Sequence, residues 1–414
     1  MISEKGKILI LKLNDKLLSI LIRDNNIVSA QVQRQTEYAV GNVYVGKVQS
    51  ISENIAAAFV DLGDGYLTFL PLAEAKHAFI TNRQSDGKLK VGDEVLVQIS
   101  REPMKTKLAG VTTQIALAGR YVVVESKHST YTKKHTAFIN PGEDRRSMIH
   151  VSSKLSRKQQ DRFRNIEELQ QIAEDCQLIV RTNAGEPESD EPLINESRQL
   201  AEQLMHILEI ADKRTCYSCL YRGKPDFLNY IENMYTTEYD EIVTDIPEIY
   251  ETLTESLSAS DILIRLYEDK LLPLHKLYAV ETRIAELLDK KVWLKSGAYL
   301  VIEPTEALIS IDVNSGKNEK GKDKEETFFK INLEAAEMIA QHLRARNLSG
   351  IILVDFINMK ENTHKQQLIE YMRTLLKLDN VPADVVDMTG LGLMEITRKK
   401  VNPSFREQYI SNGM

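Results

Sequence analysis

The apolar positions of the first hundred residues follow the two-residue period of β-strands. Residues 6–35 contain three short runs, "KILILKL", "KLLSILIRD" and "NIVSAQVQR", joined by the polar turns "NDK" and "DNN". From about residue 38 the runs are punctuated by Gly and Asp at the spacing of a small barrel, as in "GNVYVGKVQSI", "IAAAFVDLG", "GYLTFLPL" and "VGDEVLVQIS". The pattern therefore predicts three strands followed by a β-barrel.

The period changes to that of a helix near residue 156. The segment 156–175 predicts helix, with Ile166 and Leu169 on one face. "CQLIVRTNA" predicts a strand that ends in a polar turn, and "EPESDEP" (186–192) a solvated loop. A long amphipathic helix is expected next, in "INESRQLAEQLMHILEIADKR", and short strands and helices alternate over 225–290.

The last hundred residues have an α/β texture. Strands are predicted in "YLVIEPTEALISIDVN", "GIILVDFINM", "ADVVDM" and "GLGLMEITRKK", and amphipathic helices in "NLEAAEMIAQHLRARN" and "HKQQLIEYMRTLLK". The polar run "GKNEKGKDKEE" (316–326) is predicted to be a loop. Because 414 residues are too many for one domain, the chain is expected to be an α+β protein of several domains.

Polar side chains stand near the ends of two of these strands. Asp312 and Asn314 are two residues apart and therefore point to the same face, and Asp355 ends the run "IILVD". One helix links the two strands, which makes them natural neighbours in a sheet. Two carboxylates and a carboxamide are hard oxygen ligands that suit Mg²⁺, with Mn²⁺ as an alternative, and such an ion can activate water. The competing interpretation is that each Asp caps a helix or closes a turn.

The charge is distributed unevenly. The net charge of −7, from 53 Lys and Arg against 60 Asp and Glu, argues weakly against nucleic acid as a partner. However, residues 120–164 hold 11 basic against 4 acidic side chains, whereas residues 186–270 hold 7 against 20. The basic segment can attract phosphate over about 8–10 Å, and the acidic segment is expected to face away from RNA.

Cysteine content and the N-terminus indicate the compartment. Three cysteines (Cys176, Cys216 and Cys219) are too few for a disulfide framework, which favours a reducing compartment. The first residues lack the apolar core of a signal peptide, and no apolar run reaches 18 residues. We therefore expect a cytoplasmic protein without membrane association.

The segments that carry the carboxylates resemble a known family. "EALISIDVNSGK", "EETFFKINLEAAEMIAQHLRARNLSGIILVDFINM" and "GLGLMEITRKKVNPS" together resemble the catalytic region of the ribonuclease E/G family. The resemblance implies Mg²⁺-dependent endonucleolysis of single-stranded RNA. It also implies that Asp312 and Asp355 are metal ligands and that Asn314 orients the attacking water or the scissile phosphate. Asn358 stands where some relatives carry another acid and is left out of the metal site.

Residues 38–119 resemble an S1 domain, which is an OB-type barrel that binds single strands with aromatic side chains and a basic groove. The resemblance implies RNA contacts by Phe59 in "AAAFVD", Phe69 in "YLTFLPL" and Lys107 in "KTKLAGVTT". From the residues alone, Phe59 fits the core of the barrel equally well.

The segment "IVRTNAGE" resembles the start of the family's pocket for a 5′-monophosphate. The resemblance implies that Arg181 offers a planar fork to the phosphate and Thr182 a hydroxyl, with Gly119 and Val123 of "LAGRYVVV" completing the pocket. Without the resemblance, an Arg–Thr pair after a strand would be interpreted as an ordinary surface pair. Relatives commonly have Arg where this chain has Gly390, which puts the strength of 5′-end sensing in question.

The resemblance covers nearly the whole chain and implies its domain organisation. An RNase H-like scaffold would be interrupted by the RNA-binding parts and followed by a DNase I-like catalytic region. The implied parts are the scaffold (1–37 and 220–288), the S1 domain (38–119), the 5′-sensor region (120–219), the catalytic region (289–404) and a C-terminal tail (405–414).

The motif "CYSC" places Cys216 and Cys219 in a C-x-x-C pair. One pair cannot complete a tetrahedral zinc site. Relatives have a zinc-linking C-x-x-C after the catalytic region, which this sequence lacks, so Zn²⁺ is not expected and the tetramer of those relatives cannot be assumed. The alternative is a homodimer that shares one Zn²⁺ between two such pairs.

The resemblance thus implies an Mg²⁺-dependent endoribonuclease for single-stranded messenger or ribosomal RNA precursors, acting in RNA processing and decay and favouring 5′-monophosphorylated ends. Attack by water should leave 5′-phosphate and 3′-hydroxyl ends. Two alternatives stay open: a non-catalytic RNA-binding or ribosome-maturation factor, and a metal-dependent deoxyribonuclease.

Overall fold

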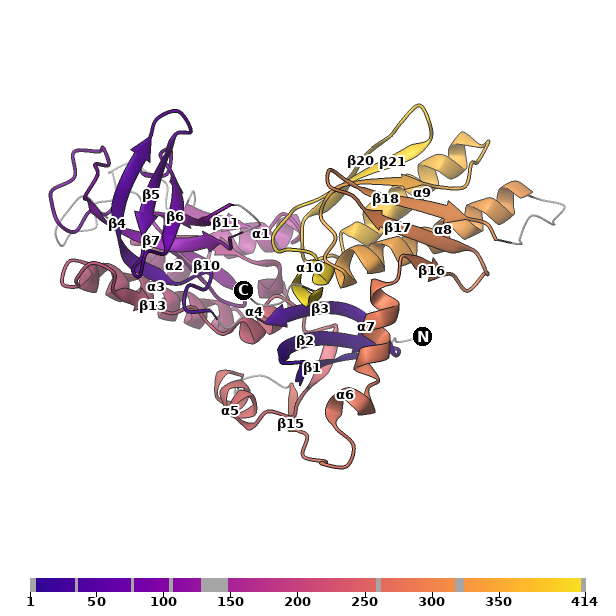
Figure 1. Cartoon of the computed structure of the whole chain (residues 1–414), viewed down its shortest axis with the longest axis horizontal. Helices are drawn as coiled ribbons and strands as arrows, with labels where there is room; N and C mark the ends of the chain where they lie inside the picture. The colour runs from indigo at the N-terminus through magenta and orange to yellow at the C-terminus, as the bar shows by residue number, and fades with distance from the viewer. Residues whose placement is uncertain are drawn as a thin grey trace. The chain divides into compact units, whose positions relative to one another are not determined.

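The computed structural model describes residues 5–33, 36–75, 78–103, 107–127, 148–257, 262–316 and 324–410. The chain divides into two compact units (Figure 1). Unit 1 consists of Met1–Gln33 and Asp226–Met414, and unit 2 of Arg34–Pro225. Each cluster of buried apolar side chains among the described residues lies within one unit, so each unit has its own core.

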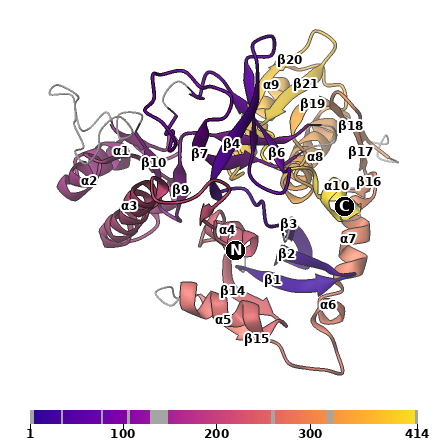
Figure 2. The same ribbon diagram turned by 60° about the vertical axis from the view of Figure 1, so that its left-hand side comes forward.

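The first sheet of unit 1 is built from both of its segments (Figure 2). The three strands predicted from the sequence are present as β1 (Gly6–Leu13), β2 (Lys16–Arg23) and β3 (Asn26–Gln33), and they pair as an antiparallel meander. Strands β14 (Tyr239–Thr244) and β15 (Leu263–Leu266) extend it in parallel with β1, in the order β15-β14-β1-β2-β3.

Helices cover both faces of this sheet. On one face pack α7 (Val280–Leu288) and Phe405 of α10 (Phe405–Ile410), and α6 (Leu274–Leu277) precedes α7. On the other face pack α4 (Asp226–Glu232) and α5 (Pro247–Ser256). Because both faces are covered, the strands are almost continuously apolar.

Within the part of unit 1 that the structure describes, the second sheet has helices on one face only. Its strand order is β16-β17-β18-β19-β21-β20. Helices α8 (Lys324–Ala345) and α9 (Asn362–Leu376) share one core with the inward-facing side chains of these strands. The opposite face is open, and we call it the open face. The strands are β16 (Lys291–Trp293), β17 (Tyr299–Pro304), β18 (Ile309–Asn314), β19 (Gly350–Asp355), β20 (Ala383–Met388) and β21 (Leu393–Arg398).

Helix α8 begins earlier than the sequence pattern predicted. It starts at Lys324, inside the run 316–326 that was predicted to be a loop. Glu325 and Glu326 lie in its first turn, where acidic side chains interact favourably with the positive end of the helix dipole. The remainder of the predicted loop, 317–323, lies outside the described residues.

Unit 2 contains a closed five-stranded barrel. The strand order is β4-β5-β6-β8-β7, and pairing of β4 with β7 closes it. The short strand β13 (Cys219–Tyr221) adds to β4. The barrel strands are β4 (Val43–Ser52), β5 (Ala57–Asp61), β6 (Leu67–Pro71), β7 (Glu94–Arg101) and β8 (Ala109–Thr112).

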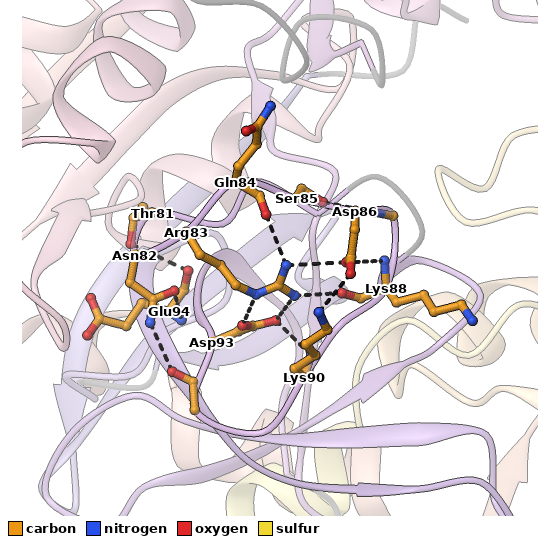
Figure 3. Close-up of polar contacts among 12 residues, drawn as sticks. Thr81, Asn82, Arg83, Gln84, Ser85, Asp86, Lys88, Lys90, Asp93 and Glu94 are labelled. Atoms are coloured by element: carbon orange, nitrogen blue, oxygen red, sulfur yellow. Dashed lines mark hydrogen bonds and ion pairs between the residues drawn. The ribbon is translucent and has the colours of Figure 1, made fainter.

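One arginine organises the loop that leads into β7 (Figure 3). The guanidinium of Arg83 donates to both oxygens of the buried Asp93 carboxylate at 2.5 and 2.7 Å, and to Asp86 at 3.2 Å. The hydrogen bonds with Asp93 raise the pKa of Arg83. Asp93 also accepts from the backbone N–H of Lys90 at 2.7 Å. With its donors committed to the loop, Arg83 has a structural role rather than one in RNA binding.

The other sheet of unit 2 has the order β11-β12-β10-β9 and packs against α3 (Glu191–Ala211). Its strands are β9 (Ala116–Ala118), β10 (Val122–Ser126), β11 (Ile149–Val151) and β12 (Cys176–Val180). The helical segment predicted over 156–175 is divided into α1 (Arg157–Arg164) and α2 (Glu167–Ile172). The backbone is extended at Ile166, and the break lets Phe163 and Leu169 enter the same core.

The protein is therefore an α+β protein with several domains, as predicted from its sequence pattern. Within the described ranges, no helix combines the length and the apolar character needed to cross a membrane.

Candidate functional site

Asp312 and Asp355 lie side by side on the open face. Strands β18 and β19 are parallel neighbours, and Asp312 is in direct register with Asp355. Both side chains are exposed, whereas Ile311 and Val354, one residue before each, are buried. The predicted pairing of these two strands is confirmed.

Asn314 lies on the same face and contacts the first carboxylate. Its Nδ2 donates a hydrogen bond of 2.7 Å to Oδ2 of Asp312. Neither aspartate is at a helix N-cap, since α8 begins at Lys324 and Glu361 caps α9. The capping interpretation therefore fails for Asp312 and Asp355.

A glycine after β18 fixes the end of that strand. Gly316 has a φ of +64°, and a Cβ placed on it would lie 2.5 Å from the carbonyl oxygen of Gly297. The turn after β18 thus packs directly on the turn between β16 and β17, and a larger residue would separate them. The glycine of the sequence motif is therefore required for this backbone contact.

The donor set fits a hard divalent cation. Two carboxylates and one carboxamide converge on an exposed surface, which suits Mg²⁺ because this ion takes few protein ligands and keeps several waters. Among the described residues, no group of three or more His, Cys, Asp or Glu side chains is arranged to hold a metal. A metal at this position would therefore depend on Asp312, Asp355 and Asn314.

The two phenylalanines of the barrel form a pair on its outer surface. Phe59 of β5 and Phe69 of β6 are in direct register, with ring centroids 6.3 Å apart and planes at 82°. Their neighbours Ala58, Val60 and Leu70 form the core, but the two rings are partly exposed. Phe59 is therefore not in the barrel core. Lys107 is exposed, two residues before β8, which pairs with β6.

The four residues predicted for the 5′-phosphate pocket lie together. Gly119 and Val123 belong to the β9–β10 hairpin, and Arg181 follows β12, the next strand of that sheet. Nη1 of Arg181 donates to the carbonyl oxygen of Gly119 at 2.5 Å. The Thr182 hydroxyl lies 2.9 Å from that of Ser152.

The sequence reasoning missed two residues at this hairpin. The carboxylate of Glu196 accepts hydrogen bonds of 2.6–3.2 Å from the backbone N–H groups of three consecutive residues, Arg120 to Val122. A Cβ on Gly119 would lie 2.3 Å from Cδ of Glu196, so a larger residue here would displace the carboxylate from these hydrogen bonds. The Arg120 side chain is buried, and its Nε and Nη2 have no partner among the described residues. No sequence signal links Glu196 to a hairpin some 75 positions earlier.

Gly390 and the two cysteines have simple surroundings. Gly390 is exposed, and a Cβ added to it would meet no atom within 4 Å. Cys216 and Cys219 are free, partly buried thiols, and burial raises the pKa of Cys216. Sγ of Cys219 contacts the carbonyl oxygen of Tyr221 at 3.3 Å.

A closed five-stranded barrel in unit 2 and a sheet with paired surface aspartates in unit 1 together define an RNA-binding protein of nuclease type. A profile of the Ribonuclease E/G family matches residues 137–401, and one of the S1 RNA binding domain matches residues 37–109. The chain belongs to the Ribonuclease E/G family.

Named relatives agree with this assignment. The chain is 32% identical to Ribonuclease E of Escherichia coli over 381 residues, 88% of this chain and 34% of that protein. It is 30% identical to Ribonuclease G of Haemophilus influenzae over 400 residues, 93% of this chain and 77% of that protein. It therefore spans about a third of Ribonuclease E and about three quarters of Ribonuclease G.

Proposed function

We propose that this protein is an endoribonuclease that cleaves single-stranded RNA by Mg²⁺-dependent hydrolysis. The observation that carries the proposal is the register of Asp312 with Asp355 on an exposed sheet face, with Asn314 bonded to the first. Family membership and the S1 barrel support RNA as the substrate. The proposal leaves the non-catalytic RNA-binding factor and the deoxyribonuclease as alternatives for the tests below.

Each side chain has a role in this mechanism. Asp312 and Asp355 would hold Mg²⁺, with Mn²⁺ as a substitute, and the ion would supply Lewis acidity and lower the pKa of water. Asn314, with Nδ2 held by Asp312, keeps Oδ1 for the attacking water or turns its amide to the scissile phosphate. Attack on phosphorus with departure of the 3′ oxygen leaves 5′-phosphate and 3′-hydroxyl ends. Phe59, Phe69 and Lys107 would clamp the strand by stacking and charge.

The same proposal includes a preference for 5′-monophosphorylated RNA. Arg181, Thr182, Gly119 and Val123 lie together at one end of a sheet, and a guanidinium and a hydroxyl suit a terminal phosphate. Processing and decay of messenger and ribosomal RNA precursors in the cytoplasm would provide such ends. Light scattering coupled to size-exclusion chromatography distinguishes a monomer from the alternative of a homodimer.

The central test is the double variant Asp312→Asn with Asp355→Asn. It should reduce Mg²⁺-dependent cleavage of a single-stranded RNA by at least about 100-fold and leave RNA affinity nearly unchanged. Among the described residues, no group of three or more acidic, His or Cys side chains is arranged to hold a metal in their place. Glu303→Gln, which removes an exposed carboxylate from neighbouring β17, is the matched control and should cleave normally. A wild type that binds RNA but never cuts it would favour the RNA-binding alternative, and equal cleavage of DNA would favour the deoxyribonuclease.

The 5′-end preference is tested with paired oligonucleotides that carry a 5′-phosphate or a 5′-hydroxyl. The wild type should cleave the phosphorylated one faster, and Arg181→Gln should remove most of the difference. Arg157→Gln, on the exposed side of α1, is the control. Equal rates for both substrates with the wild type would remove Arg181 and Thr182 from their proposed role.

A further inference from the structure

The exposed Lys291 and Trp293 of β16 and the half-buried Tyr299 of β17 form a compact group. Trp293 is 61% exposed, and its ring centroid lies 5.2 Å from that of Tyr299. The Lys291 ammonium lies 4.1 Å from the Trp293 centroid and 3.8 Å from the Tyr299 centroid. We call these three residues the aromatic group.

The aromatic group lies on the same open face as the proposed metal site. Trp293 is in register with Tyr299, and Tyr299 with Asn314. In the adjacent row, Lys291 is in register with Val301, and Val301 with Asp312. Val292 and Leu300 point the other way and pack in or against the core. Neighbouring strands are about 4.8 Å apart. The backbone of Trp293, two strands away, therefore lies about 10 Å from the backbone of Asn314.

The chemistry of the group suits an unpaired base beside a phosphate. Stacking of a base on an aromatic ring contributes about 1–3 kcal/mol and does not depend on the base. Among the described residues, the Lys291 ammonium has no carboxylate within ion-pair distance, so none of these side chains neutralises its charge. An exposed tryptophan can stack on the base of a nucleotide, and a cation beside it can attract the phosphate of the same strand.

The position of the group favours RNA over another ligand. A strand whose scissile phosphate lies at Asp312 and Asp355 must place its neighbouring nucleotides over the adjacent strands of the same face. The aromatic group occupies that position in the direction of Asn314. The simpler explanation, that the rings only cover the edge strand β16, predicts no response to RNA.

We propose that Trp293 and Tyr299 stack an unpaired base next to the scissile phosphate, and that Lys291 contacts a flanking phosphate. This inference rests on the proposed function. The three residues are positioning residues: they bring the phosphodiester to the carboxylates. A base held in a duplex cannot reach the rings, so the group also contributes to the choice of single-stranded substrate.

The first test uses fluorescence, because Trp293 is the only tryptophan of the chain. In the Asp312→Asn, Asp355→Asn protein, a single-stranded RNA 10-mer should quench the emission saturably, and a blunt RNA duplex should not. RNA binding is followed in parallel by anisotropy of labelled RNA. Binding without any change in Trp293 emission would overturn the proposal even if the wild type is an active nuclease.

The second test separates stacking from a structural role. Trp293→Ala and Tyr299→Ala should lower kcat/KM about tenfold to a hundredfold, and Trp293→Phe should retain most of it. Removing one base near the cleavage site, by an abasic substitution, should slow the wild type but not Trp293→Ala. Val386→Ala, an exposed apolar residue on β20 of the same sheet, is the control. If the abasic substitution slows the wild type and Trp293→Ala equally, the stacking role is wrong. The proposed nuclease activity is tested separately, by the variants of Asp312 and Asp355.

Discussion

Single residues on β18 have different environments according to which face they occupy. Ile311 and Val313 are buried, but Asp312 between them is exposed to water. A carboxylate pair in direct register would be very unfavourable in the core, and the open face avoids this desolvation cost. The two like charges still repel each other across the strands.

This repulsion gives a prediction about the metal. With EDTA, Asp355→Asn should raise the free energy of unfolding by about 0.5 kcal/mol, because like charges in opposite positions destabilise a sheet. With saturating Mg²⁺ the wild type should become more stable than Asp355→Asn, because an ion that binds the folded wild type raises its free energy of unfolding. Thermal denaturation with and without Mg²⁺ measures both effects. The control is Asp384→Asn, which removes an exposed acid on β20. If Mg²⁺ does not change the stability of the wild type, the prediction is wrong.

Gly390 permits a gain-of-function test. The added side chain of Gly390→Arg meets no steric barrier, because the space around a Cβ at this position is open. A guanidinium here adds a positive charge at an exposed position and should raise the affinity for single-stranded RNA at low salt, because it attracts the phosphates. Anisotropy of labelled RNA measures the change. Gly390→Gln is similar in length but neutral; if it acts as strongly as Gly390→Arg, charge is not the cause.

At the scale of elements, α8 contains a histidine, His342, that makes the stability of the folded protein depend on pH. Nδ1 of His342 accepts a hydrogen bond of 2.9 Å from Nε of Arg346, which requires the neutral imidazole. Burial, with the positive charge of Arg346, lowers the pKa of His342 to about 3. Between pH 6.5 and about 3 the unfolded chain therefore binds a proton that the folded protein does not, and stability falls as the pH falls.

The prediction is that His342→Gln flattens this dependence. Gln can accept the same hydrogen bond, and the loss of unfolding free energy below pH 6.5 should shrink by up to about 1.4 kcal/mol per pH unit. Urea denaturation from pH 7.5 to 4.5 measures the slope. His206→Gln, on an exposed part of α3, should retain the wild-type slope. Equal slopes for wild type and His342→Gln would show that His342 titrates normally.

Much of each element could be predicted from local patterns, and the misses have physical causes. Alternation and a single linking helix were enough to pair Asp312 with Asp355, because short crossovers join neighbouring strands. The break at Ile166 was not visible, since residues on both sides of it are helical and amphipathic. Glu196 could not be found, because its contacts with the β9–β10 hairpin depend on how α3 packs.

The aromatic group illustrates the same limit. "KVW" is a strand of three residues, too short to show a period, and its partner Tyr299 lies across a turn. Only the register of β16 with β17 reveals that Lys291, Trp293 and Tyr299 share a face with the carboxylates.

At the scale of the whole molecule, the proposed RNA clamp of the barrel and the proposed carboxylate site lie in different units. Unit 2 is one continuous segment, Arg34–Pro225, and its clusters of buried side chains come from that segment alone. A fragment of residues 34–225 should therefore fold and bind single-stranded RNA, but show no Mg²⁺-dependent cleavage. Circular dichroism and anisotropy measure folding and binding. The same fragment with Phe59→Ala and Phe69→Ala should fold but bind more weakly, and an unfolded wild-type fragment would contradict the prediction.

The sheet that joins the first strands to β14 has a consequence for synthesis. When β1, β2 and β3 leave the ribosome, β14, the parallel partner of β1, lies about 200 residues further along the chain. Synthesis of these residues takes roughly 10–40 s. During that interval the barrel and the other sheet of unit 2 can already fold. The edge of β1 that pairs with β14 stays unpaired until β14 is made. A growing chain would therefore complete the segment of unit 2 before the sheet that carries Asp312 and Asp355 has been synthesised.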